Sequence, residues 1–487
     1  MVAPLEMHAL VPVTTLRTFL TAALLCLLPA APARTNNGHP AEQAFVRLVS
    51  ADSARRYVRE LVAYGPRQGG TSSNRAAAEY VQQKFRAWGL ASTLITDPGK
   101  LVYEAQHWEL AQVFPEAKSF LRPWPYGFSP AAAAQEAEVT MASGAAALRG
   151  KVVLTDKLVS RRQYEAYAGA GAVALLSDAP GREGDFTAWA MIGTLPERRD
   201  NPIPVFAISR SDGNRLRALL AQGVIPRVAF ALQSKIFHGR PQTVIATLAG
   251  AVPEKHFIYC AHGDSDSGGP GADDNASGVA VVMETARVLQ SLITEKKLPP
   301  PRHTIAFIIW GSEYFSTRAY LAQRSHQLER ILGVINFDQT GTGTRQQAIY
   351  FEGNDIPWNE ALLRTLDRIG GEYCGRPGFW QAYTTNPSQG GTDAYVFLPP
   401  QFHGTLQAPQ HIPAVTIFTA AWDQPARPEQ TPGWHSSCWP AQTPLEIDYS
   451  RYYHSSGDIP EWTTDREPWR MAWAARAGGL ALLRLLW

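Results

Sequence analysis

Four apolar runs in the second half of the chain have the character of buried parallel strands. They are nearly continuous instead of alternating, as expected for strands that are covered on both faces. Between the first two runs, apolar side chains recur at helical spacing from about Gly278 to Leu292. This order of strand, helix and strand predicts a βαβ unit. The four predicted strands are His256–Ala261, Thr304–Trp310, Leu332–Phe337 and Ala414–Phe418.

The preceding part of the chain predicts two further zones. From Ala41 to about Gly89 the apolar spacing predicts two helices around the loop Gly65–Gly70, and a strand follows at Ser92–Thr96. Beyond these, short β-like runs alternate with Ala- and Gly-rich helical pieces, which is typical of a compact α+β insert. We predict an α/β fold: a mixed, mostly parallel sheet flanked by helices, with a smaller α+β inserted domain. The predicted boundaries are 1–33 for a signal peptide, 41–114 and 243–487 for the main domain, and 115–240 for the insert.

The first 33 residues have the order of a signal peptide. Arg17 precedes a short apolar core, Thr18–Leu28, and the small-residue run Ala31-Pro32-Ala33 follows. This core is shorter than the roughly 20 residues that span a bilayer, and we expect no later stretch of that length. A lipid anchor at Cys26 is the weaker interpretation, because bulky residues precede it. We expect a secreted or periplasmic protein with no integral membrane segment after signal removal.

Composition narrows the classes of partner. The 487 residues are 45% hydrophobic and 18% charged, which is typical of a globular protein, and the length favours two or three domains. The net charge is +2 and no block of like charge stands out, so nucleic acid is not an expected partner. After export three cysteines remain, an odd number, and a bridge between Cys374 and Cys438 is left open.

Residues that bind metals follow the ends of the predicted strands. Open α/β sheets bind ligands outside the carboxyl ends of their strands, so these side chains should converge. Each motif also has an ordinary interpretation, such as a surface His-x-Asp or an Asp that caps a helix. Together they supply the nitrogen and oxygen ligands that zinc prefers. The motifs are His262-Gly263-Asp264, Gly269–Gly278 with Asp273 and Asp274, Glu313-Tyr314, Asn336-Phe337-Asp338 and Tyr452–Asp458 with His454.

In order and spacing, these motifs resemble the zinc-dependent aminopeptidase and glutamate carboxypeptidase family. The resemblance implies that Asp274 bridges two zinc ions. It implies that His262 and Asp338 complete one site and that His454 serves the other. Asp264 would orient His262 through its second ring nitrogen, and Asp273 would support the loop. The segments Leu148–Leu154 and Gly169–Val173 resemble a protease-associated domain, and the loop Gly65-Pro66-Arg67 with Asn74 also matches the family.

The family's two consecutive glutamates are only partly present. The first is normally a general base and the second a zinc ligand. Counting from Trp310 places Glu313 at the base position and Tyr314 at the ligand position. The other register makes Glu313 the ligand and leaves Ser312 where a base is needed. We favour Glu313 as the base. Because a neutral phenol replaces a carboxylate, we expect two zinc ions, of which one is bound weakly or not at all.

The resemblance implies a secreted zinc metallopeptidase, an aminopeptidase that hydrolyses peptide substrates with a metal-activated water. Two alternatives stay open: a receptor-like or binding homologue whose metal site has decayed, and a glutaminyl cyclase, a single-zinc relative without the insert. Aromatic residues that either line a substrate pocket or pack in the core are Trp380, Tyr383, Tyr395 and Trp422.

Overall fold

The four predicted parallel strands form the centre of the first sheet. In the computed structural model they are β12 (His303–Trp310), β11 (Val252–His262), β13 (Ile331–Phe337) and β16 (Ala414–Phe418), adjacent in that order and parallel. Antiparallel pairs flank them at β10 and β14. The sheet is therefore mixed and mostly parallel, as predicted. Its outer strands are β1 (Ala91–Thr96), β10 (Gln242–Leu248), β14 (Ala348–Glu352) and β15 (Ala382–Asn386).

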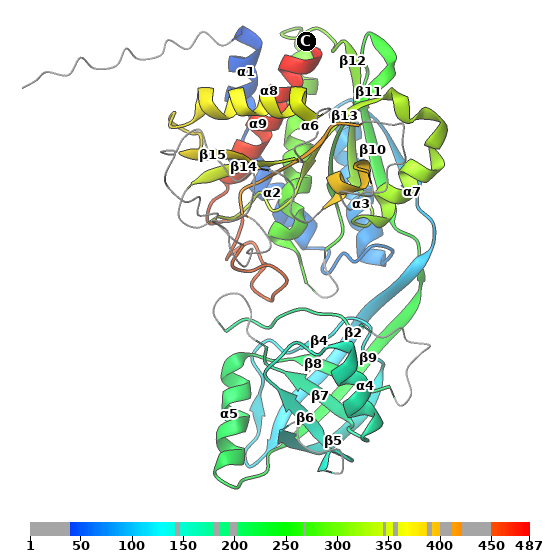
Figure 1. Ribbon diagram of the computed structural model, residues 1–487, viewed down its shortest axis with the longest axis vertical. Helices are drawn as coiled ribbons and strands as arrows, with labels where there is room; N and C mark the ends of the chain where they lie inside the picture. The colour runs from blue at the N-terminus through cyan, green and yellow to red at the C-terminus, as the bar shows by residue number, and fades with distance from the viewer. Residues whose placement is uncertain are drawn as a thin grey trace, which may run out of the picture. The chain divides into compact units, whose positions relative to one another are not determined.

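Alternate side chains of the central strands enter two different cores. On β11, Phe257, Tyr259 and Ala261 face one hydrophobic cluster, whereas Ile258 and Cys260 face the other, because successive side chains of a strand point to opposite faces. Both faces are covered, which explains the continuous apolar runs. The first cluster contains side chains from six helices: α1 (Pro40–Leu48), α2 (Ala51–Val62), α3 (Ser72–Ala87), α6 (Gly278–Thr294), α8 (Glu360–Tyr373) and α9 (Trp469–Leu486). To the second cluster, α7 (Phe315–Gln323), η4 (Ser325–Arg330) and η6 (Asp393–Phe397) contribute (Figure 1).

The N-terminal region forms three helices where the sequence predicts two. Ser50 ends the expected continuous helix, because its Oγ accepts the N–H of Ser53 at 3.2 Å and caps the start of α2. Thr71 caps α3 in the same way, accepting from Asn74 at 3.2 Å. The loop between α2 and α3 carries Arg67, which becomes important in the metal centre.

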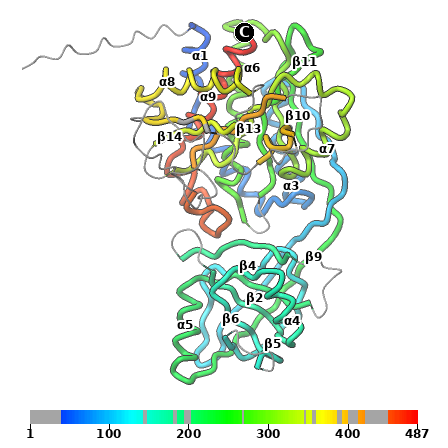
Figure 2. The backbone as a smooth tube through the Cα atoms, viewed as in Figure 1, coloured from blue at the N-terminus to red at the C-terminus, as the bar shows by residue number. Residues whose placement is uncertain are grey.

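A second eight-stranded sheet is formed by the part of the chain predicted as an insert together with the strand that precedes it, β2 (Lys100–Phe114). Two long strands, β2 and β9 (Arg227–Gly239), pair antiparallel along almost their whole length and can be followed as adjacent tubes in Figure 2. The sequence missed β2, because exposed polar residues such as His107 and Glu109 interrupt its apolar pattern. The other elements are β3 (Lys118–Ser119), β4 (Trp124–Pro125), β5 (Ala132–Met141), β6 (Val152–Thr155), α4 (Arg161–Gly169), β7 (Ala174–Ser177), β8 (Val205–Ala207) and α5 (Arg210–Ala221).

The structure describes residues 39–141, 147–179, 185–193, 202–265, 269–343, 347–353, 359–386, 392–399, 412–420 and 450–487. The predicted signal peptide, Trp422 and Cys438 lie outside these ranges. Cys260 is a free, buried thiol, and Cys374 is disulfide-bonded. Residues Pro40–Trp487 form one compact unit. The predicted boundary between main domain and insert therefore remains a prediction.

Among the described residues, one helix is long and apolar enough to cross a membrane, which corrects the expectation that no later stretch reaches that length. It spans Ala272–Thr294, and 78% of its most apolar window is buried inside the protein. It also begins with the buried carboxylates Asp273 and Asp274. Burial inside the protein, between the first sheet and α9, explains its apolar character.

Gly478 of α9 provides a test of the helix-to-sheet packing. A Cβ at this position would lie 2.6 Å from the ring of Phe337 and 2.6 Å from the hydroxyl of Tyr259. Alanine in a helix normally gains about 1 kcal/mol over glycine. Here we expect Gly478→Ala to lower the free energy of unfolding by about 1–3 kcal/mol, because the close contact must open. The control is Gly169→Ala in α4, where no atom lies within 4 Å. Equal stability of both variants in urea denaturation would refute the packing.

Candidate metal centre

Three predicted ligands converge at the carboxyl ends of β11 and β13. His262 ends β11, Asp338 follows β13, and Asp274 lies in η3 (Ala272–Ser277) just before α6. The Nε2 atom of His262 is 3.4 Å from Asp338 Oδ2 and 3.6 Å from Asp274 Oδ1. One ligand atom of each residue lies within 4.8 Å of the other two. His262 Nε2 and Asp338 Oδ1 are buried without a hydrogen-bond partner. A nitrogen and an oxygen ligand atom directed at one point fit a zinc ion.

The fourth predicted ligand, His454, meets the other oxygen of Asp274. Its Nε2 lies 3.2 Å from Asp274 Oδ2, whereas His262 faces Oδ1. The carboxylate therefore stands between two imidazoles, in the position expected of a bridging ligand. His262 is almost completely buried, but the side chain of His454 is 39% exposed. The two halves of the centre thus differ in their access to solvent.

Asp264 connects His262 to Glu313. The Nδ1 atom of His262 lies 3.2 Å from Asp264 Oδ1 and 3.1 Å from the Asp264 carbonyl oxygen. The same Oδ1 accepts the backbone N–H of Glu313 at 2.9 Å. A carboxylate on the second ring nitrogen fixes the tautomer and orientation of a ligand histidine. Asp264 is therefore placed to hold His262 with Nε2 directed into the centre.

Glu313 and His262 carry strongly perturbed pKa values. Burial raises the pKa of Glu313 well above its usual value; the charge of His262 opposes this and that of Asp338 adds to it. For His262 burial would lower the pKa, but Asp338 and Glu313 outweigh it and the pKa lies well above normal. The charges of Glu313 and His262 each shift the pKa of the other group, which is typical of a functional site. Glu313 is thus a carboxyl with unusually high proton affinity beside the ligand cluster.

Tyr314 occupies the position where the family resemblance places a second carboxylate ligand. Its φ of +52° is unusual for a residue with a side chain, and its N–H donates to Asp393 Oδ1 at 2.9 Å. The ring packs against the second hydrophobic cluster, and the Arg318 guanidinium lies 5.6 Å from its centroid. Burial raises the pKa of the Tyr314 phenol strongly, and the charge of Glu313 adds to the shift. Ionisation of Tyr314 to a phenolate ligand is therefore disfavoured.

Asp458 supports the ligand loop, a role that sequence reasoning missed. Its carboxylate accepts the backbone N–H groups of Asp273 at 2.6 Å and Asp274 at 3.1 Å. Asp273 in turn accepts from the N–H of Gly341 at 2.8 Å and from the Thr342 hydroxyl. Burial raises the pKa of Asp458 well above normal and that of Asp273 to about 6. The signal was the place of Asp458 in the His454 motif, but its partners are visible only in the fold.

Arg67 ties together the loops that carry His262 and Asp274. This side chain is completely buried, and its guanidinium donates to the carbonyls of Gly263 at 3.2 Å, Gly271 at 3.0 Å, and Pro270. Burial lowers the pKa of Arg67 to about 10, so it stays charged at neutral pH. It therefore also supplies positive charge to the nearby carboxylates of Asp458, Asp264 and Asp274. The sequence indicated only a family-like loop here.

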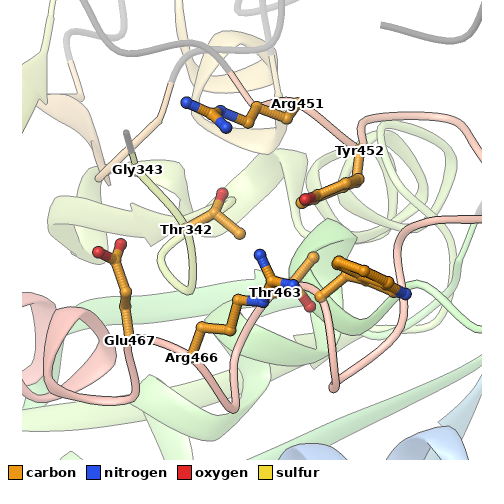
Figure 3. A pocket seen from close by; sticks show the side chains of 8 residues that line it. Thr342, Gly343, Arg451, Tyr452, Thr463, Arg466 and Glu467 are labelled. Carbon is orange, nitrogen blue, oxygen red and sulfur yellow. The ribbon is translucent and has the colours of Figure 1, made fainter. Parts of the chain in front are cut away.

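A cavity of about 190 Å³ borders the supporting residues of the centre (Figure 3). Thr342 belongs to both, because it lines the cavity and its hydroxyl donates to Asp273. The aromatic residues considered for a substrate pocket lie elsewhere: Trp380, Tyr383 and Tyr395 are buried in the hydrophobic clusters. The cavity is lined by Thr342, Gly343, Arg451, Tyr452, Trp462, Thr463, Arg466 and Glu467.

Comparison with known proteins identifies relatives of this architecture. Residues 243–478 match the model of peptidase family M28. The chain is 30% identical over 216 residues to the probable lipoprotein aminopeptidase LpqL of Mycobacterium tuberculosis, and 29% identical over 220 residues to leucine aminopeptidase 2 of Trichophyton rubrum. Each alignment covers 43% of this chain, and they cover 40% and 41% of the two relatives. The matched region thus spans about two fifths of the relatives' length.

Solved structures extend the similarity of the fold to most of the chain. A peptidase M28 precursor from Shewanella amazonensis SB2B superimposes with a TM-score of 0.64 at 18% identity, covering 91% of this chain and 95% of that chain. BSAP, a zinc aminopeptidase from Bacillus subtilis, gives 0.59 at 19% identity, covering 90% and 95%. At these identities the similarity establishes the fold alone, and it confirms the predicted α/β architecture.

Replacing Arg67 tests its role in joining the two loops. We expect Arg67→Met to lower the free energy of unfolding of the metal-stripped protein by about 3–5 kcal/mol, because buried carbonyls and carboxylates lose their partner. Arg67→Lys should retain the charge but lose the multiple hydrogen bonds, giving an intermediate loss. The matched control is Arg75→Met, since Arg75 is exposed and pairs with Glu79 on the surface of α3. Denaturant unfolding measures all three, and a similar loss for Arg67→Met and Arg75→Met would contradict this role.

Proposed function

We propose that this chain is a member of peptidase family M28, whose model matches residues 243–478, and that it is a zinc-dependent exopeptidase, specifically an aminopeptidase that acts on peptide substrates. The observation that carries the proposal is the convergence of His262, Asp274 and Asp338 on one point. The aminopeptidase names of the relatives agree with it. We also propose that the protein is secreted or periplasmic, on the strength of the signal-like segment at residues 1–33.

The ligand cluster has the properties that a hydrolytic zinc site requires. His262, Asp274 and Asp338 would hold one ion, with two donor atoms, His262 Nε2 and Asp338 Oδ1, that have no other hydrogen-bond partner. Zinc bound there would lower the pKa of a coordinated water and polarise the scissile carbonyl. Asp264 would keep His262 oriented during the reaction.

Glu313 is the proposed general base. Its backbone is anchored to Asp264, and its carboxyl lies in the field of His262 and Asp338. In this role Glu313 would accept a proton from the attacking water and deliver it to the leaving amine. The half-buried Glu313 therefore lies close enough to the ligand cluster for its carboxyl and the charges of the ligands to affect one another.

The second metal position is proposed to be weak. His454 and the shared Asp274 offer two ligands there, and Tyr314 replaces the carboxylate that the family resemblance places beside them. The strongly raised pKa of the half-buried Tyr314 phenol keeps it neutral. We therefore infer one tight zinc ion and one weakly bound or absent ion.

A non-catalytic binding homologue is the second candidate, and the replacement at Tyr314 is the observation that favours it. The intact cluster of His262, Asp274 and Asp338 argues for retained chemistry. The glutaminyl cyclase alternative is less favoured, because the chain carries the second sheet between β1 and β10. An assay that includes cyclisation of N-terminal glutamine would distinguish this alternative from peptide hydrolysis.

Substitution of Glu313 tests the proposed activity. We expect Glu313→Gln to reduce kcat on aminoacyl-p-nitroanilides by about 10²–10⁴-fold, because the amide cannot accept the proton. Zinc content should stay unchanged, since the amide occupies the same volume and Glu313 is not a proposed ligand. Glu254→Gln, an exposed position, is the control and should leave kcat unchanged. Full activity of Glu313→Gln, or activity that survives removal of zinc by a chelator, would refute the mechanism.

Changing Tyr314 tests the number of metal sites. Zinc titration by calorimetry should detect one tight site in the natural protein. We expect Tyr314→Glu to tighten a second site by at least about tenfold, because a carboxylate rejoins Asp274 and His454. Tyr314→Phe should leave zinc binding unchanged, since the phenol is not ionised. Two equally tight ions in the natural protein, or loss of an ion in Tyr314→Phe, would overturn the assignment.

A further inference from the structure

The backbone of His454 is held in a conformation that its own side chain disfavours. Its φ is +49°, in the left-handed region that residues with a Cβ rarely adopt. The imidazole reaches Asp274 from this conformation, with Nε2 3.2 Å from Oδ2. Such a backbone persists only where surrounding contacts determine it. We define the histidine loop as residues 452–458 and consider which contacts hold it.

A short segment from the region of the second sheet pairs with the histidine loop like a neighbouring strand. The N–H of Trp189 donates to the carbonyl of His454 itself, at 2.7 Å. The Thr187 N–H donates to Ser456 Oγ at 3.0 Å, and the Ser456 N–H donates back to the Thr187 carbonyl at 2.9 Å. Ala188 and Ser455 form an antiparallel bridge between these bonds. We call residues 186–189 the clamp segment.

Phe186 of the clamp segment anchors the ends of this pairing. Its ring packs edge-on against Tyr452 at 5.4 Å and against Trp462 at 5.8 Å. A Cβ on Gly457 would lie 3.1 Å from the Phe186 ring and 2.6 Å from Tyr452, so the contact is close. Tyr452 also lines the cavity of Figure 3. Phe186 therefore supports the histidine loop through one of the residues that line this cavity.

Trp189 links the clamp segment to the loop that carries Asp274. Its indole covers Gly269, where a Cβ would lie 1.4 Å from a ring atom. Gly269 precedes Pro270 and Gly271, whose carbonyls accept from Arg67. On its other side, Trp189 contacts Trp124 at 6.0 Å between ring centroids, and Trp124 contacts Trp108 at 4.7 Å. The clamp segment thus touches both loops that meet at Asp274.

We propose that the clamp segment is a positioning element for His454. Through backbone hydrogen bonds and the Phe186 and Trp189 rings, it holds the histidine loop in its left-handed conformation, so that the imidazole stays at Asp274. The occupancy of the second metal position then depends on a segment outside the ligand-bearing sheet. This inference extends the proposed function. Only the effect on metal binding rests on that function, because the loop conformation itself does not require activity.

Hydrogen exchange of the full-length, metal-stripped protein tests the loop conformation directly. In Phe186→Ala and Trp189→Ala we expect backbone amides of residues 452–458 to exchange at least about tenfold faster, while α6 and β11 stay within about twofold of the natural protein. Met191→Ala is the matched control, because Met191 follows the clamp segment but is 50% exposed. Phe186→Leu, which retains bulk, serves as the milder variant if Phe186→Ala fails to fold.

Zinc affinity distinguishes positioning of His454 from general loosening. In the Tyr314→Glu background, in which the second site is expected to bind zinc measurably, Phe186→Ala should weaken zinc binding at that site at least about fivefold. Once His454→Ala is added, Phe186→Ala should have no further effect, as a double-mutant cycle measures. Unchanged exchange in the histidine loop, faster exchange throughout the sheet, or an equal zinc effect in both backgrounds would overturn the proposal. An inactive protein that shows the expected exchange would refute the peptidase assignment and support the clamp.

Discussion

Charge balance at the carboxyl edge of the first sheet is the constraint on which the centre depends. Asp338 is buried after a strand end, Asp274 before a helix start and Asp458 in the histidine loop, and an isolated buried carboxylate is very unfavourable. The protein supplies only part of the compensation, through Arg67, the imidazoles and backbone N–H donors. Burial raises the pKa of Asp458 well above normal and that of Asp273 to about 6, and the negative charge of neighbouring carboxylates adds to both shifts. A divalent cation held by His262, Asp274 and Asp338 would offset this negative charge.

The two halves of the centre are held by different kinds of structure. His262 and Asp338 lie at the ends of neighbouring parallel strands, whose ladder hydrogen bonds restrict their backbones. His454 lies in a loop, and its partners include the clamp segment, Asp274 and the stacked ring of Tyr453. Sites on strands are generally more precise than sites on loops. The proposed first metal position should therefore be preformed, whereas the proposed second position would depend on the packing contacts of the clamp segment.

Most of the central sheet could be predicted from the sequence because both of its faces are covered. Phe257 and Ile258 enter opposite hydrophobic clusters, so β11 reads as an unbroken apolar run, and the same holds for β12, β13 and β16. The long strand β2 escaped prediction because its exposed polar residues obscure the pattern. The break between α1 and α2 depends on a single cap at Ser50, which competes with an otherwise helical spacing.

The candidate ligands were predictable because their chemistry is local to strand ends, but the groups that position them were not. Asp458 and Arg67 act on backbone amides and carbonyls of residues distant in sequence, and backbone atoms leave no signature in side-chain patterns. The same is true of the clamp segment, since Thr187 and Trp189 bond to the histidine loop mainly through their main chains.

The replacement at Tyr314 is consistent with this balance of charge. A carboxylate at this position would add an anion that the charges of Glu313 and Asp393 would repel, and burial already raises the pKa values of both groups. A neutral phenol removes that repulsion, and its ring gains contact with the hydrophobic cluster below the sheet. The backbone N–H of Tyr314 donates a hydrogen bond to Asp393 Oδ1. With one carboxylate fewer, Arg67 and a single divalent cation come closer to neutralising the cluster. The proposed centre with one tight metal ion agrees with this balance of charge, and the half-buried His454 is the proposed ligand whose position depends on the clamp segment.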